Sequence, residues 1–245
     1  MIPNGPRFLK FIRRNIPLDE KEAEQKFMGN GEFIIYAFDL IGTAAFAFSG
    51  ALRAIDRHPD FIGMLLLAGV TAIGGGMIRD AILGREAAVL SDPLYFWMIL
   101  APVILIYFFP SSFWKRAGLF NYFDAFGFGA FAGVAANIGV QLEMNLFAIM
   151  LLAFLTGCGG GVVRDVILNK PAQPLSDELY AIPVFFGALA LYLLNIFPLP
   201  GLDPEQIRVL GFLAAFLITT GWRLAAISWN LRLPRVDYHE NRPSS

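Results

Sequence analysis

The chain has 245 residues, of which 56% are hydrophobic and 16% are charged, and its mean hydropathy is +0.58. Because a soluble domain usually carries about 25% charged residues, this composition excludes an ordinary soluble enzyme and predicts an all-α integral membrane protein. The net charge of −1 leaves no basic surplus for nucleic acid, and one cysteine with two histidines is too few for a disulfide or a metal cluster, so no cofactor is expected.

Residues 1–32 are predicted to form a polar tail. They contain the basic stretch "RFLKFIRRN" and then the mixed-charge run "PLDEKEAEQK", without the apolar core and cleavage site of a secretory signal. The apolar residues of the basic stretch are expected to touch the membrane interface.

Seven segments are apolar enough to be membrane-spanning helices, each of which needs about 20 mainly apolar residues. Polar or turn-rich links separate most of them, and Pro102 and Pro183 are expected to bend the third and the sixth. The predicted spans are 33–52, 61–83, 94–110, 120–141, 145–168, 179–197 and 207–228.

The two halves of the chain repeat each other. The motif "GGGMIRD" begins at residue 74 and "GGGVVRD" at residue 159, and these numbers differ by 85. At the same offset, "LSDPLY" at 90–95 matches "LSDELY" at 175–180. Between 38–95 and 123–180, 24 of 58 positions are identical, which is too many for chance and indicates an internal duplication.

Each copy holds three spans, so the second copy must enter the membrane from the opposite side. The sequence therefore predicts a 3+3 inverted repeat with its working site near the midplane, plus a seventh helix outside the duplication. The expected organisation is a polar tail 1–32, a first repeat 33–110, a second repeat 111–197, a seventh transmembrane helix 198–228 and a polar C-terminal tail 229–245.

Basic residues gather in the links on one side of the predicted bundle. These residues are Arg53, Arg57, Lys115, Arg116, Lys170, Arg232 and Arg235, whereas the opposite links carry little beyond Arg85. The positive-inside rule then predicts a cytoplasmic C-terminus and an N-terminus on the other side of a bacterial inner membrane. The basic residues of the N-terminal tail argue against this orientation.

The glycine triplets lie near the middle of the second and fifth spans. They are Gly74, Gly75 and Gly76, and Gly159, Gly160 and Gly161. Glycine weakens a helix and leaves carbonyl groups uncovered, which lipid tolerates only where they face protein or a water-filled cavity. The triplets are thus candidates for hinges in kinked helices that line a pore; the alternative is close packing of two helices.

Charged residues inside spans are costly and usually face the bundle interior. Asp39 and Arg79 lie at similar depth near one face of the membrane, and Asp124 and Arg164 repeat that relation near the opposite face. We therefore predict two ion pairs, Asp39–Arg79 and Asp124–Arg164, as pore charges. The alternative is that each arginine snorkels to the headgroups and each aspartate caps a helix.

Asp80 and Asp165 directly follow the two arginines, so on a helix they point elsewhere and are expected to be poor ion-pair partners for them. They lie one step nearer the membrane surface and are candidates to draw cations to the pore mouths. Simple solvation at the end of a helix is the other interpretation.

Weaker candidates are the hydroxyl and amide groups along the same spans. Thr71, Thr156, Ser49 and Asn137 could offer oxygens to a path, although each could equally be bonded within its own helix. No set of residues has a catalytic pattern, and neither glycine motif has the lysine of a nucleotide-binding loop, so no enzyme activity is expected.

Seven spans, the duplication, and the motifs "GGGMIRD" and "GGGVVRD" resemble the prokaryotic branch of the trimeric intracellular cation (TRIC) channel family, over roughly residues 33–228. Bacterial sequences of this type are also catalogued as a glycine transporter domain family. The resemblance implies a homotrimer with a cation pore in each subunit, lined by glycine-kinked second and fifth helices, with Arg79 and Arg164 just beyond the triplets. Animal members hold a phosphoinositide through a lysine where this chain has Gly160, so lipid regulation does not carry over, although membrane lipid remains an expected partner.

The predicted function is a channel for monovalent cations, K⁺ and also Na⁺, with weak selectivity because the sequence has no "TVGYG"-like filter. A secondary transporter for a small solute such as glycine shares the same architectural features. A membrane scaffold without transport is a further alternative, and it leaves the doubled glycine–arginine motif unexplained.

Overall fold

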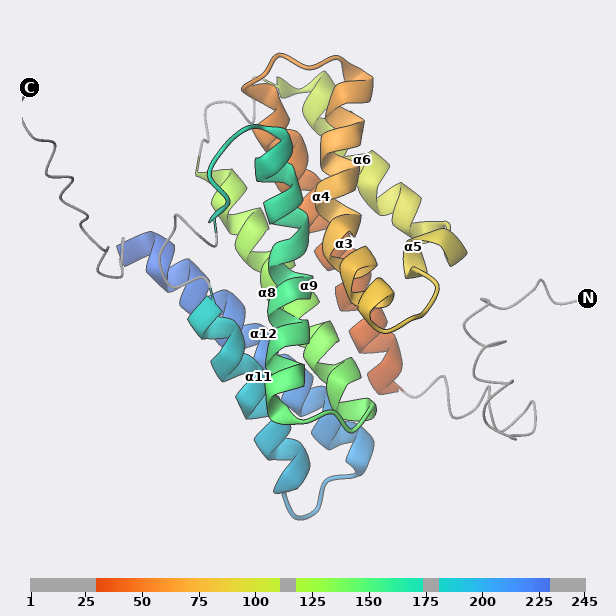
Figure 1. The fold of residues 1–245 in the computed structure, drawn as a ribbon, viewed down its shortest axis with the longest axis vertical. Helices are drawn as coiled ribbons and strands as arrows, with labels where there is room; N and C mark the ends of the chain where they lie inside the picture. Colours follow the sequence, from red (N-terminus) through yellow and green to blue (C-terminus); the bar gives the residue numbers. More distant parts are fainter. Residues whose placement is uncertain (1–29, 111–117, 174–180, 230–245) are drawn as a thin grey trace, which may run out of the picture.

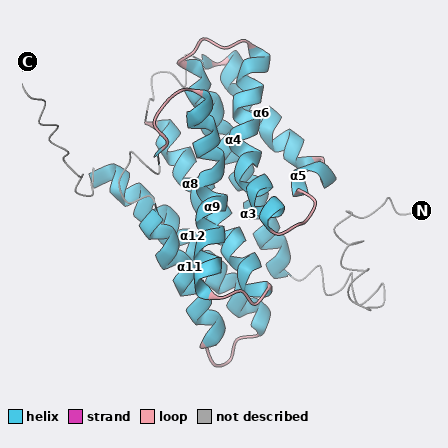
Figure 2. Ribbon diagram, in the orientation of Figure 1, coloured by secondary structure: helices cyan, strands magenta, loops and turns pink. Residues whose placement is uncertain are grey.

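A computed structural model describes residues 30–110, 118–173 and 181–229, and these residues are entirely helical apart from short links (Figures 1 and 2). Residues 1–29 of the predicted N-terminal tail, with its apolar residues, and nearly all of the C-terminal tail lie outside the described residues. The same holds for the "LSDELY" stretch at 175–180. Residues 30–32, predicted as the end of the N-terminal tail, instead begin the first described helix.

The described helices agree with the predicted spans to within three residues at their ends. They are α3 Asn30–Ile55, α4 Phe61–Ile82, α5 Ala88–Ser91, α6 Leu94–Phe108, α8 Leu119–Gln141, α9 Leu146–Ile167, α11 Ala181–Ile196 and α12 Pro204–Trp229. Five of them are long and apolar enough to cross a membrane, whereas α6 and α11 are apolar but shorter. The four-residue α5 is not among the predicted elements.

Polar residues in the links define where the long helices begin. The Asp60 side chain accepts a hydrogen bond from the Gly63 amide at 2.7 Å, and the Asn145 side chain accepts one from Ala148 at 3.0 Å. Each satisfies an amide of the first helical turn that has no partner within the helix. The residues two before these caps, His58 and Glu143, have positive φ and turn the chain into the next helix. The short links between apolar runs therefore set the helix boundaries.

Helices α4 and α9 pack against each other in the middle of the bundle, with α3 beside α4 and α8 beside α9. Helices α3 and α8 also pack on each other, so these four helices form the centre. The pair α11 and α12 covers one side, at the lower left of Figure 1, and α5 and α6 cover the other. Helix α6 continues through Pro102, and whether Pro102 and Pro183 bend their helices remains a prediction.

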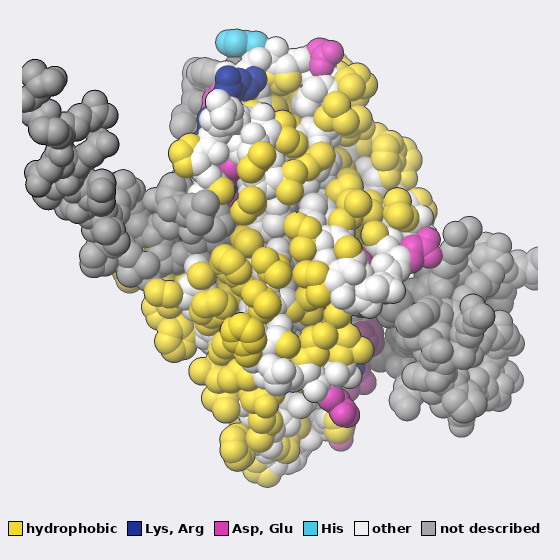
Figure 3. All heavy atoms as spheres, viewed as in Figure 1, with side chains coloured by type: hydrophobic (Ala, Val, Ile, Leu, Met, Phe, Trp, Pro, Cys, Tyr) yellow, Lys and Arg dark blue, Asp and Glu magenta, His cyan; other side chains and the backbone are white. Residues whose placement is uncertain are grey.

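The outer surface of the bundle is apolar. Large side chains such as Phe147, Leu90 and Phe33 are 75%, 73% and 69% exposed. Apolar side chains cover most of the face drawn in Figure 3, and charged side chains gather toward its edges. A soluble monomer rarely exposes so large an apolar surface, but in a membrane that surface contacts lipid. The structure is therefore that of a multi-pass helical membrane protein.

Candidate functional site

The two glycine triplets meet where α4 crosses α9. A Cβ added to Gly75 would overlap the carbonyl oxygen of Thr156, and one added to Gly160 would overlap the carbonyl oxygen of Thr71. A Cβ on Gly74 would lie 3.1 Å from the Cα of Gly160. Thr71 and Gly75 lie 85 residues before Thr156 and Gly160, so these contacts are reciprocal. Glycine is required here because the two backbones touch.

This geometry supports the packing interpretation of the triplets. Helix α4 continues without a break through Gly74, Gly75 and Gly76, and α9 continues through Gly159, Gly160 and Gly161. The contacts also run in opposite directions along the two helices, so α4 and α9 cross antiparallel. The hinge role of the triplets is untested by these contacts and stays a prediction.

One charged cluster lies one turn beyond Gly160 in α9. It consists of Ser49, Asp124, Arg164, Asp165 and Gln173, and we call it the Arg164 cluster. Arg164 is 0% exposed and donates to Asp124 Oδ1 at 2.7 Å, Ser49 Oγ at 2.8 Å and Gln173 Oε1 at 3.2 Å. The predicted Asp124–Arg164 ion pair is present.

Two guanidinium groups at the same end of the bundle lie over the aromatic ring of Phe120. The central carbon of the Arg53 guanidinium is 3.8 Å from the ring centroid, and that of Arg164 is 4.7 Å away. A π face attracts cations, so the ring allows two positive side chains to approach each other. Phe120 thereby helps to hold Arg164 toward Asp124.

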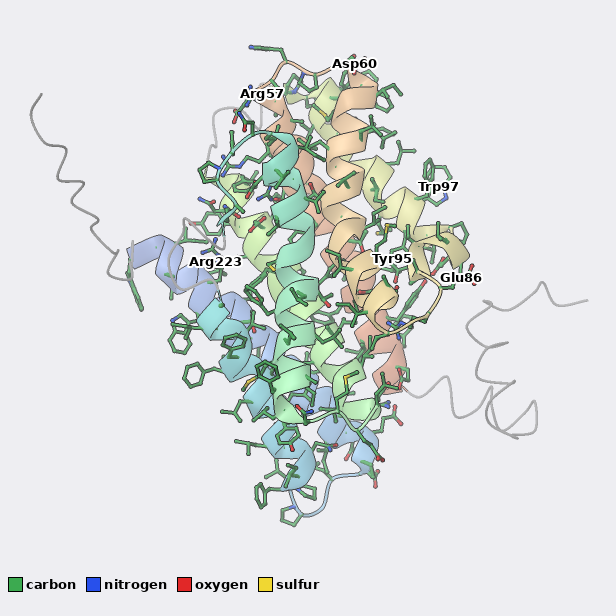
Figure 4. All side chains as sticks on the ribbon, viewed as in Figure 1. Arg57, Asp60, Glu86, Tyr95, Trp97 and Arg223 are labelled. Carbon is green, nitrogen blue, oxygen red and sulfur yellow. The ribbon has the colours of Figure 1, made fainter. Side chains whose placement is uncertain are left out.

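A second cluster lies one turn beyond Gly75 in α4. It consists of Asp39, Arg79, Asp80 and Tyr95, and we call it the Arg79 cluster; Tyr95 is labelled in Figure 4 beside α5. Arg79 is 3% exposed, and its Nη1 lies 3.6 Å from Asp39 Oδ1, so the predicted ion pair is present but looser than its counterpart. The Tyr95 hydroxyl donates to the other carboxylate oxygen of Asp39.

The expectation that each arginine and the following aspartate are poor partners is wrong. Arg79 Nε donates to Asp80 Oδ1 at 2.8 Å, and Arg164 Nε donates to Asp165 Oδ1 at the same distance. Each pair sits in the last two turns of its helix. There the long arginine side chain turns back, so that its guanidinium meets the neighbouring carboxylate.

Asp80 and Asp165 are 2% exposed, so they are neither solvated at a helix end nor open to solvent at a pore mouth in this structure. The second carboxylate oxygen of Asp80 accepts a hydrogen bond from the backbone amide of Ala88 at 3.1 Å. The second carboxylate oxygen of Asp165 accepts one from the backbone amide of Gln173 at 3.1 Å. Arg85 adds an ion pair to Asp80 at 2.8 Å. Both aspartates therefore tie the link that follows the helix to the helix itself.

The weaker polar candidates divide into two groups. Thr71 and Thr156 each donate to the carbonyl four residues earlier in their own helix at 2.6 Å, which confirms the local interpretation for them. Ser49 instead belongs to the Arg164 cluster, and Asn137 is buried in α8 with no hydrogen-bond partner for its side-chain oxygen.

Sequence reasoning missed three residues of this site: Phe120, Gln173 and Tyr95. The repeated "LSDPLY" stretch contains Tyr95 and could have drawn attention to it. Gln173 and Phe120 have no such signal. Within the described ranges, no three His, Cys, Asp or Glu side chains gather closely enough to hold a metal ion.

The arrangement consists of two buried clusters of paired charges, one on each side of an antiparallel glycine crossing, inside an apolar helical bundle. Such buried ionisable groups are costly in a membrane and are typical of membrane proteins that move solutes or ions. The fold and the site thus define a polytopic membrane protein with buried charges of the kind found in transport proteins.

Within that class, the chain belongs to the family whose model is described as "Glycine transporter". The model matches residues 36–111 and 121–195. The UPF0126 inner membrane protein YadS of Escherichia coli K12 is 33% identical over 216 residues, which cover 85% of this chain and 99% of YadS. A UPF0126 membrane protein of Deinococcus radiodurans is 33% identical over 187 residues, covering 75% of this chain and 85% of the relative.

Solved structures of TRIC channels have the same fold. The TRIC trimeric intracellular cation channel orthologue from Rhodobacter sphaeroides is 29% identical, with a TM-score of 0.73 over 81% of this chain and 99% of that one. A structure that addresses conductance through TRIC cation channels is 29% identical, with a TM-score of 0.72 over 83% of this chain and 97% of that one. The resemblance found from the motifs is confirmed, and these similar proteins are channels and membrane proteins rather than enzymes.

Proposed function

We propose that the chain is a subunit of a channel for monovalent cations, K⁺ and Na⁺, and that each subunit has its own pore lined by α4 and α9. The observation that carries this proposal is the match to TRIC cation channels at 29% identity over 81% of the chain. Because such a match covers nearly the whole membrane region, it favours conservation of the conducting path along with the fold.

The geometry of the site supports the same path. Asp39, Asp124, Arg79 and Arg164 are buried charges on both sides of the α4–α9 crossing. A cation that crosses there needs oxygens to replace part of its water shell, and carboxylates provide them once the arginines move. The glycine triplets then serve as the points at which the two helices bend or separate.

An inverted repeat with seven membrane crossings accounts for the reciprocal contacts. The family model matches two stretches that begin at residues 36 and 121, and these numbers differ by 85. The ring of Phe46 packs edge-on against that of Phe131, 85 positions later, with centroids 5.1 Å apart. Contacts between equivalent residues are expected on an axis that relates two inverted copies. We propose a homotrimer on the same basis as the channel activity.

Ion flux decides between this function and its alternative. The description of the matching family favours a glycine transporter as the second candidate. Purified protein in liposomes is expected to give unitary, non-saturating K⁺ currents, with Na⁺ carried at a comparable rate because the sequence has no "TVGYG"-like filter. Bi-ionic reversal potentials measure the preference, and strong selectivity for K⁺ would contradict the prediction. Saturable uptake of radiolabelled glycine without currents would make the protein a transporter.

The proposed orientation has a cytoplasmic C-terminus in a bacterial inner membrane. Arg57 and Asp60, labelled at the upper end of Figure 4, mark the end at which the described basic residue Lys170 pairs with Asp56. Lys115, Arg116, Arg232 and Arg235 lie outside the described residues. In a Cys158→Ala background, which removes the single cysteine, Pro171→Cys is expected to react with a membrane-impermeant maleimide only after cell lysis. Leu202→Cys, on a link at the other end, is expected to react in intact cells. The reverse pattern would overturn the orientation.

A further inference from the structure

One difference between the two charged clusters is a bridging hydroxyl group. In the Arg164 cluster, the Ser49 hydroxyl lies between the two partners of the ion pair, 2.8 Å from Arg164 Nη1 and 3.1 Å from Asp124 Oδ1. It accepts from the guanidinium and donates to the carboxylate, so it joins the pair as well as filling the space beside it.

The packing of α3 on α8 identifies the residue that takes the equivalent position in the Arg79 cluster. Ser49 pairs with Asp124, and one turn earlier on α3 the ring of Phe46 packs against Gly127. In this antiparallel packing, each residue further back along α3 faces a residue further forward along α8. The same register therefore pairs Asp39 with Val134. Val134 is buried and has no hydroxyl, so the Arg79 cluster lacks the bridge.

The Arg79 cluster shows the consequence of that difference. Arg79 Nη1 and Asp39 Oδ1 are 3.6 Å apart, and both atoms are buried without a hydrogen-bond partner. A cavity of about 20 Å³ adjoins them, lined in part by Asp39, Arg79, Tyr95, Thr43 and Gly76. A water molecule needs roughly 10–15 Å³ and at least two polar partners, and this cavity offers both.

We propose that this cavity is a binding site for one water molecule, which accepts from Arg79 Nη1 and donates to Asp39 Oδ1. If both groups stayed unpaired, the folded protein would lose the whole free energy of their hydration. A polar contact longer than 3.5 Å is commonly bridged by water. An alkali cation fits poorly, because it would lie as close to the positively charged guanidinium group of Arg79 as to the carboxylate of Asp39. The water therefore does for Asp39 and Arg79 what Ser49 does for Asp124 and Arg164.

This site has a consequence for gating that rests on the proposed channel function. The water between Asp39 and Arg79 can exchange with other water molecules. Asp124 and Arg164 are instead joined by a direct hydrogen bond and by the Ser49 hydroxyl, which is part of the chain. The Asp39–Arg79 end of the path is therefore the end that opens more readily. Adding a fixed hydroxyl there is expected to hold it shut.

The test compares Val134→Ser with Val134→Ala. Both variants remove the same methyl groups, and they differ only in the hydroxyl. Val134→Ser is expected to melt about 2–4 °C above Val134→Ala. In liposomes its K⁺ flux is expected to be about two- to tenfold lower, the ratio that corresponds to one additional hydrogen bond. Equal melting temperatures would show that a hydroxyl at position 134 does not bridge Asp39 and Arg79, which would overturn the proposed correspondence with Ser49.

A crystal structure of the wild-type protein in lipid, at a resolution that shows ordered water, tests the site without reference to transport. Density within hydrogen-bond distance of both Arg79 Nη1 and Asp39 Oδ1 supports the proposal. A dry cavity, a direct Arg79–Asp39 hydrogen bond, or an anomalous signal from Tl⁺ at this position would each overturn it. If the wild type carries no K⁺ current but the water is present, the channel function fails while the water site stands.

Discussion

Gly75→Ala and Gly160→Ala are each expected to abolish ion flux and to lower the melting temperature of the purified protein by about 6–12 °C. The new Cβ would overlap the carbonyl oxygen of Thr156 or Thr71. A backbone carbonyl in a packed helix cannot rotate away, so α4 and α9 must separate. Overpacking of this kind costs about 3 kcal/mol of the free energy of unfolding or more. Thermal unfolding in detergent and K⁺ flux in liposomes measure the two effects.

Gly221→Ala is the matched control for these variants. Gly221 lies inside α12, and a Cβ added there would have no atom within 4 Å. Alanine is favoured over glycine in a helix by about 1 kcal/mol, so this variant is expected to melt at the wild-type temperature or slightly above it. Altered currents in Gly75→Ala at an unchanged melting temperature would contradict the packing argument and leave a hinge as the sole role of the triplet.

Arg164→Met is expected to destabilise the protein by about 3–5 kcal/mol, measured as a lower midpoint of thermal or denaturant unfolding. Arg164 is completely buried and donates to Asp124, Asp165 and Gln173. Methionine keeps much of the volume but leaves two buried carboxylates without their shared cation. Their desolvation is then uncompensated, which is what makes the loss of one partner from a buried ion pair so costly.

Lys170→Met is the comparison for an ion pair outside the bundle. Lys170 pairs with Asp56 at 3.1 Å, and the two side chains are 32% and 49% exposed. An exposed pair of this kind contributes about 0–1 kcal/mol, so the variant is expected to unfold almost as the wild type does. If Arg164→Met and Lys170→Met destabilised the protein equally, the Arg164 cluster would have no special part in holding α3, α8 and α9 together.

The sequence by itself predicted the helices, most of their ends and two of the buried ion pairs. Runs of about 20 apolar residues are needed to span lipid, and links such as the one containing Asp60 supply the caps, so the element boundaries are local properties. The ion pairs Asp39–Arg79 and Asp124–Arg164 followed from depth in the membrane, which a fixed rise per residue makes predictable.

Only the tertiary structure decided how these parts touch. That Gly75 and Gly160 pack against backbone carbonyls depends on the angle and register at which α4 crosses α9, which no local pattern specifies. The link from Arg79 to Asp80 depends on a side-chain rotamer at a helix end, and sequence spacing predicted the opposite. The proposed water bridge depends in the same way on the register of α3 against α8, which places Ser49 beside Asp124. Neighbours across that contact are set by packing, since the chain brings them together only when the bundle has formed.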